Sequence, residues 1–87
     1  MKPEDIEHVL DEIEKVLSGL HEYQTNKARQ IAHRIRPDLT SEDLLNPDNF
    51  SELISDPNFM YEDGIAAGIL AAKMALRARL RELGASS

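Results

Sequence analysis

The chain has 87 residues, the size of one small domain, and no cysteine, which excludes disulfides and thiolate metal sites. Ten basic and sixteen acidic residues give a net charge of −6, and this balance disfavours a broad phosphate-binding surface. Leu, Ile, Ala and Glu are abundant and aromatic residues are few, so the composition favours an all-α fold.

The first predicted element is a long helix over residues 3–36. Pro3 suits a first helical turn, and the acidic residues after it suit the positive end of the helix dipole. Pro37 disfavours helix in the residue before it, so the helix is expected to end near Arg36. Apolar residues recur at steps of three and four and define one face: Ile6, Leu10, Ile13, Leu17, Leu20, Ala28, Ile31 and Ile35. This face is widened along one flank by Val9, Val16 and Tyr23.

The next segment, residues 38–55, is predicted to be an ordered elbow with one or two short helices. Thr40 or Ser41 can cap the first of them, and Asn46 can cap a turn that begins at Pro47. The elbow is too apolar to stay in water, because it contains Leu39, Leu44, Leu45, Phe50, Leu53 and Ile54.

A second long helix is predicted over residues 57–83, with Asp56 as its cap and Pro57 in its first position. Gly84 is expected to end it, leaving residues 84–87 as a frayed tail. Its large apolar residues lie on one stripe: Ile65, Ile69, Leu76, Leu80 and Leu83. Beside this stripe lies a face of small residues, which are Gly64, Gly68, Ala71 and Ala75. The solvent side is expected to carry Lys73, Arg77 and Arg81.

Charge alternates along the chain, with net −5 over residues 1–24, +4 over 25–36, −8 over 37–63 and +3 over 64–87. If the two long helices lie antiparallel, each acidic half faces a basic half. Each helix also has its acids near its N-terminus and its bases near its C-terminus, as the helix dipole favours. The basic clusters therefore have a structural explanation before any functional one.

Two long helices and an elbow cannot enclose a core alone, because the second helix offers two adjacent packing faces. We therefore expect residues 1–87 to form a single helical domain whose hairpins pair into a dimeric four-helix bundle. The alternative is that the helix of a different protein covers the open face. The expected interface residues are Val9, Val16, Tyr23, Gly64, Gly68, Ala71 and Ala75.

Carboxylates and a histidine on the first helix are the candidate metal ligands, and Glu4, His8 and Glu12 stand one turn apart. A metal-dependent, all-helical hydrolase is the alternative function, and it would use Glu4, Glu7, His8, Asp11 and Glu12. A magnesium site between two helices would need a matching acidic pair in the other helix, and the adjacent Glu62 and Asp63 do not have that spacing. We therefore expect solvated surface residues here, and no cofactor.

Two other groups of residues favour partners of different kinds. The basic cluster Lys27, Arg29, Arg34 and Arg36 could contact RNA or DNA, which makes a nucleic-acid-binding regulator the second alternative function. No stacking aromatic residue is interleaved with these residues, so we do not expect nucleic acid as a partner. An apolar patch at the start of the second helix could dock a protein partner or plug the end of the bundle; it comprises Phe59, Met60 and Tyr61.

These observations predict a non-enzymatic interaction module, a small dimeric helical adaptor, regulator or accessory subunit. Its partner would be a second copy of the chain or another helical protein. Lys2 to Asp5 lacks the apolar core of a secretory signal, and the longest apolar run, residues 64–72, is too short to span a bilayer. We therefore expect a soluble, cytoplasmic protein that does not enter a membrane.

Overall fold

The computed structural model describes residues 2–86 and contains three α-helices, α1 (Pro3–Ile35), α2 (Ser51–Ile54) and α3 (Pro57–Ser86). Two 3-10 helices, η1 (Asp43–Leu45) and η2 (Pro47–Asn49), lie between α1 and α2. No strand occurs in residues 2–86, so the predicted all-α class is confirmed.

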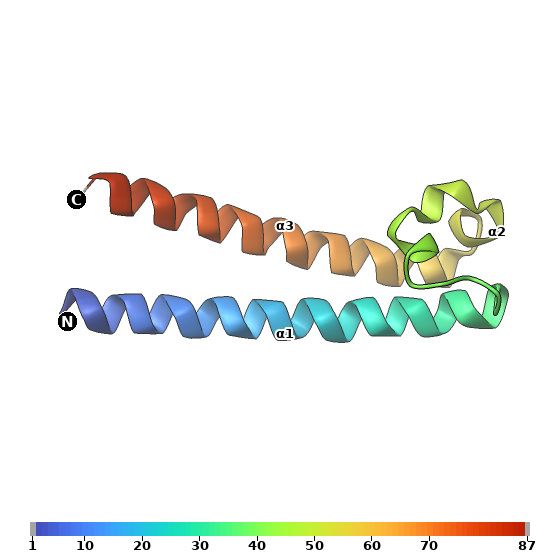
Figure 1. Ribbon diagram of the computed structural model, residues 1–87, viewed down its shortest axis with the longest axis horizontal. Helices are drawn as coiled ribbons and strands as arrows, with labels where there is room; N and C mark the ends of the chain where they lie inside the picture. The colour runs from blue at the N-terminus through green and yellow to red at the C-terminus, as the bar shows by residue number, and fades with distance from the viewer. Residues whose placement is uncertain (1, 87) are drawn as a thin grey trace.

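The two long helices lie side by side and run in opposite directions, which gives a hairpin-like molecule of 50 × 21 × 19 Å (Figure 1). The elbow folds over one end of the pair, and both chain ends lie at the other. Ion pairs cross between the helices, as the charge pattern predicts: Glu14 contacts Arg77, and Lys27 Nζ lies 3.5 Å from a Glu62 carboxylate oxygen.

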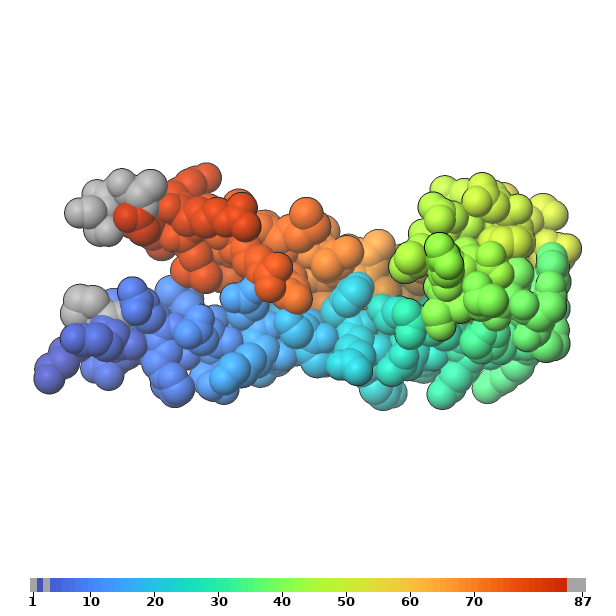
Figure 2. Space-filling view, in the orientation of Figure 1, coloured from blue at the N-terminus to red at the C-terminus, as the bar shows by residue number. Residues whose placement is uncertain are grey.

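The buried core is gathered at the elbow end of the hairpin, where it comprises Ala28, Ala32, Leu39, Leu53 and Phe59. Leu53 is fully buried, and Ile31, Ile35, Leu44 and Phe50 pack around this cluster. The space-filling view shows the elbow lying against both long helices at this end, while α1 and α3 alone form the rest of the molecule (Figure 2). Most of the buried apolar residues therefore lie at the elbow end, where the elbow and the two long helices meet.

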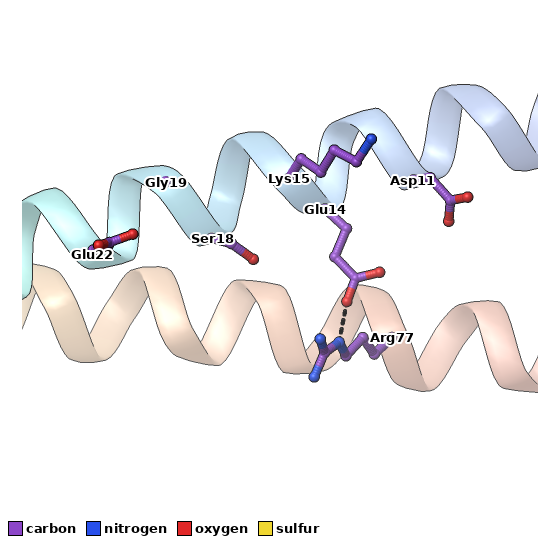
Figure 3. A pocket seen from close by; sticks show the side chains of 7 residues that line it. All are labelled: Asp11, Glu14, Lys15, Ser18, Gly19, Glu22 and Arg77. Carbon is purple, nitrogen blue, oxygen red and sulfur yellow. Dashed lines mark hydrogen bonds and ion pairs between the residues drawn. The ribbon is translucent and has the colours of Figure 1, made fainter.

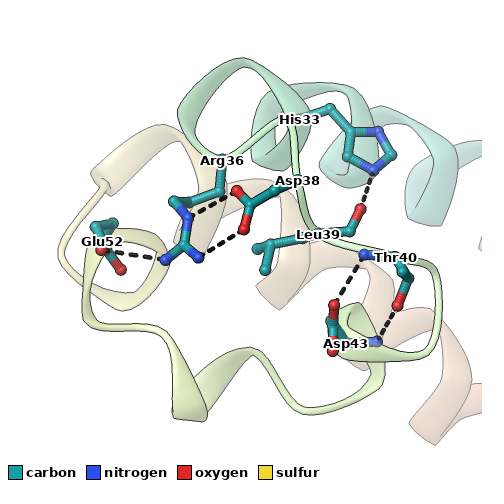
Figure 4. A network of polar contacts seen from close by, with 7 residues as sticks. All are labelled: His33, Arg36, Asp38, Leu39, Thr40, Asp43 and Glu52. Atoms are coloured by element: carbon teal, nitrogen blue, oxygen red, sulfur yellow. Dashed lines mark hydrogen bonds and ion pairs between the residues drawn. The ribbon is translucent and has the colours of Figure 1, made fainter.

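Polar contacts hold the elbow in place, as predicted for an ordered segment (Figure 4). The Arg36 guanidinium donates two hydrogen bonds to the Asp38 carboxylate, at 2.9 and 2.8 Å, and one to Glu52 at 3.2 Å. Thr40 and Asp43 cap each other: the Thr40 amide donates to Asp43 Oδ2 at 2.9 Å, and the Asp43 amide donates to Thr40 Oγ1 at 3.1 Å. This reciprocal pair satisfies backbone donors at the start of η1.

The predicted starts of the two long helices are confirmed, but the side chain of Asn46 does not cap η2, and one predicted end is wrong. The Phe59 amide donates to Asp56 Oδ1 at 2.8 Å, which makes Asp56 the cap of α3. Gly84 does not end α3, which continues to Ser86, because Gly84 does not adopt the positive φ of a helix-ending glycine. The last residue of the predicted tail, Ser87, lies outside the described residues.

The predicted solvent side of α3 also requires a correction. Arg81 is exposed as predicted, but Lys73 is half-buried, and Arg77, although exposed, reaches across to pair with Glu14 of α1. Long basic side chains can cover apolar surface with their methylene groups while the charged end reaches a carboxylate at the edge. The opposite face of α3 carries the small residues instead.

Candidate functional site

An exposed apolar row runs along the N-terminal two thirds of α1. We name it the α1 seam, and it consists of Ile6, Val9, Ile13, Val16, Leu20 and Tyr23. These side chains are between 43% and 65% exposed, although all six are large and apolar. Their spacing alternates strictly between three and four residues, which is the pattern of a coiled-coil seam. Such a row usually contacts another helix, and α3 leaves about half of it exposed.

The face that α1 presents to α3 is a different one. Leu10 and Leu17 are half-buried, and Gln24, Ala28 and Ala32 are buried, so α3 packs along this line. The apolar face predicted for α1 is therefore divided. Three of its members, Ile6, Ile13 and Leu20, lie in the α1 seam together with the predicted flank residues Val9, Val16 and Tyr23.

Exposed apolar residues of α3 lie beside α1 residues at both ends of the hairpin. Near the elbow, Tyr61 lines a shallow hollow with Ile31, and Tyr61 is 68% exposed. Near the chain ends, Leu80 and Leu83 line a second hollow with Ile6. Near the chain ends, the open apolar surface therefore continues from Ile6 of the α1 seam onto α3.

The predicted small-residue face of α3 is exposed, since Gly64, Gly68, Ala71 and Ala75 all lie at the surface. A Cβ atom added to Gly64 or Gly68 would meet no other atom within 4 Å. Packing within this chain therefore does not require glycine at either position, and these residues are free to contact another molecule.

The predicted patch at the start of α3 is split. Phe59 is only 3% exposed and belongs to the core, where it anchors α3 against the elbow. Met60 and Tyr61 are exposed, so they alone can meet a partner.

A buried polar group links the two long helices. Gln24 is 7% exposed, and its amide donates to the Glu62 carboxylate and, at 3.3 Å, to the Glu62 carbonyl oxygen. The same carboxylate pairs with Lys27. Because a buried amide requires hydrogen-bond partners, this group favours one register of α1 against α3. Gln24 interrupts the apolar pattern of α1, which marked it in the sequence, but its partner could not be identified there.

A charged hollow between the long helices offers little to a ligand (Figure 3). Its lining residues are Asp11, Glu14, Lys15, Ser18, Gly19, Glu22 and Arg77. Glu14 points across the gap to Arg77, so its charge is already compensated. The arrangement is that of an ion pair at a helix contact.

The residues of the two alternative functions do not come together as sites. Glu4, His8 and Glu12 are all exposed, and Glu12 pairs with Lys15 at 3.1 Å, which lowers the pKa of Glu12. Within residues 2–86 no three histidine or acidic side chains are placed to hold a metal ion. In the basic cluster, Lys27 and Arg36 already pair with acids of the same chain.

The pKa of Asp63 is raised, because burial disfavours its charged form and the nearby Asp48 repels it. An aspartate with a raised pKa in the folded chain reduces stability as pH rises through that pKa, because the folded state holds the proton more tightly. We therefore expect Asp63→Asn to raise the melting temperature at pH 7. The gain should shrink as the pH falls toward about 4 and disappear below about pH 3, where the acid is protonated in both the folded and the unfolded chain. An equal gain at both pH values would contradict this account.

In comparisons with known proteins, no family model, curated protein or solved structure matches this chain. No helix within residues 2–86 combines the length and apolar character needed to cross a bilayer. The α1 seam is therefore the strongest candidate for a functional surface, on the grounds of its own geometry.

Proposed function

We propose that this chain is a non-enzymatic interaction module, a dimeric helical adaptor, regulator or accessory subunit. The observation that carries the proposal is the α1 seam, in which six large apolar side chains with coiled-coil spacing are left about half exposed. Removing the exposed half of each of these side chains from water contributes on the order of 1 kcal/mol to the free energy of association, which favours contact with another helix.

Two further features support a binding role over catalysis. The candidate metal ligands Glu4, His8 and Glu12 lie on exposed positions of α1. In the charged hollow, Glu14 is paired with Arg77. The small-residue face of α3 leaves room for a second backbone to approach closely. A second copy of the chain is the simplest partner, because pairing two hairpins gives a four-helix bundle.

Sedimentation equilibrium and native mass spectrometry of the purified chain test the proposal. A dimer that dissociates on dilution, with no added mass from a ligand, is the expected result. A chain that stays monomeric at the highest soluble concentration would contradict the homodimer. Extra mass matching a metal ion would contradict the non-enzymatic assignment and direct attention to the α1 acids.

A further inference from the structure

We infer that the open end of the hairpin binds a lysine- and arginine-rich amphipathic helix of a partner protein, in the hollow between α1 and α3. This goes beyond the proposed function, because it adds a second contact surface whose occupant has a different chemistry. The hollow has a volume of about 390 Å³, and its lining residues are Ile6, Glu7, Leu10, Asp11, Leu80, Leu83 and Gly84.

The walls of this hollow are apolar and incompletely covered. Leu10 and Leu80 are half-buried, whereas Ile6 is 44% and Leu83 is 50% exposed. Ile6 and Leu10 stand one turn apart on α1, and Leu80 and Leu83 do so on α3, so each helix supplies one wall of a trough. The two helices diverge toward the chain ends, which leaves the trough open (Figure 1). A third helix laid along it can insert apolar side chains spaced three or four residues apart.

The charged groups of the hollow select the chemistry of that helix. Among the described residues that line it, two are acids, Glu7 and Asp11, and none is basic. Neither carboxylate forms an ion pair within residues 2–86. Two unpaired carboxylates one turn apart, beside apolar walls, complement a helix that carries Lys or Arg next to its apolar face.

The basic residues at this end of α3 do not neutralise the two acids. Arg77 pairs with Glu14, and Arg79 pairs with Glu82 at 2.8 Å. Arg81 is exposed and does not line the hollow. An acidic helix in the hollow would meet two carboxylates without a counterion, and the repulsion disfavours such a partner.

The hollow and the α1 seam lie on different sides of α1. Residues two apart in a helix point about 160° away from each other, so Asp11 lies nearly opposite Val9. Only Ile6 belongs to both surfaces. The chain can therefore hold a basic helix in the hollow while the rest of the seam contacts a second copy.

Titration calorimetry with a model peptide tests this inference. The probe is a peptide of about 18 residues, built only of leucine and lysine in an amphipathic pattern and long enough to form a helix. Its matched control carries glutamate in place of every lysine. The chain should bind the lysine peptide, more weakly as ionic strength rises, and should not bind the glutamate peptide.

Charge variants of the chain locate the contact. Glu7→Gln/Asp11→Asn should raise the Kd for the lysine peptide about tenfold, because it removes two exposed ion pairs. The matched variant Glu4→Gln/Glu12→Gln removes the same charge from exposed positions of α1 outside the hollow. It should leave the Kd almost unchanged.

Truncation of apolar side chains distinguishes the hollow from the seam. Leu83→Ala should raise the Kd about fivefold, because apolar contact with the peptide is lost. Val16→Ala, in the middle of the seam, should not change it. An effect of Val16→Ala alone would place the peptide on the seam and overturn the inference.

Three further results would also overturn it: no binding of the lysine peptide at its highest soluble concentration, equal binding of both peptides, or the same Kd in both charge variants. Sedimentation separates this inference from the proposed function. A monomer that binds the peptide through the hollow would contradict the homodimer alone. A dimer that does not bind the peptide would contradict this inference alone.

Discussion

Replacing Leu53 with alanine is expected to destabilise the folded chain by about 2–5 kcal/mol. Leu53 is fully buried and belongs to the same core cluster as Ala32, Leu39 and Phe59. Truncation removes apolar contacts and leaves a cavity that the short elbow segments cannot readily fill. A domain of this size has a total stability of roughly 5–15 kcal/mol, so the loss would be a large share of it. Urea unfolding followed by circular dichroism measures the change.

The neighbouring Ile54→Ala variant is the control for this prediction. Ile54 belongs to the same short helix α2 but is 43% exposed, so its truncation should cost much less. If both variants lose the same stability, the elbow does not pack as described. If neither does, the core lies elsewhere.

Introducing a charge into the middle of the α1 seam, as Val16→Lys, should weaken dimerisation by at least about a hundredfold in Kd. An ammonium group buried without a partner costs several kcal/mol, and roughly 3 kcal/mol corresponds to that factor. Val16 is 60% exposed in the single chain, so the substitution should leave the hairpin itself folded. Lysine is also a slightly better helix former than valine. Sedimentation equilibrium gives the Kd, and circular dichroism at high dilution reports the helix content.

The matched variant is His8→Lys, which also places a lysine on an exposed position of α1 but outside the seam. It should leave the dimer almost unchanged. An equal loss in both variants would mean that net charge, rather than the seam, controls association. No loss in either would remove the seam from the interface.

Local signals in the sequence were sufficient to predict the two long helices and their starts. Asp56 before Pro57, and Thr40 three residues before Asp43, are capping patterns that act within one turn, so neighbouring residues alone determine them. The end of α3 was mispredicted because a glycine ends a helix only when its backbone leaves the helical region. Gly84 does not do so, and α3 continues.

The sequence alone could not predict how the apolar residues of α1 divide between the face that contacts α3 and the exposed seam. Periodicity shows that Ile6, Leu10 and Ile13 share one broad side of a helix, but α3 can pack against any part of that side. The register is favoured by contacts between distant residues, chiefly Gln24 with Glu62 and Glu14 with Arg77. Once these form, Leu10 faces α3 while Ile6 and Ile13 remain open.

Because the core is concentrated at the elbow, the two ends of the hairpin differ in local stability. Near the elbow, α1 and α3 are joined through buried side chains and a network of hydrogen bonds, whereas toward the chain ends few side chains are buried. Segments with little buried apolar contact open at a low free-energy cost, so backbone amides near the chain ends should exchange with solvent earlier than those near the elbow. Because the α1 seam lies mostly along this loosely held part, a partner that covers it would also complete the folding of the hairpin. Recognition and the final ordering of the two long helices would then be a single event.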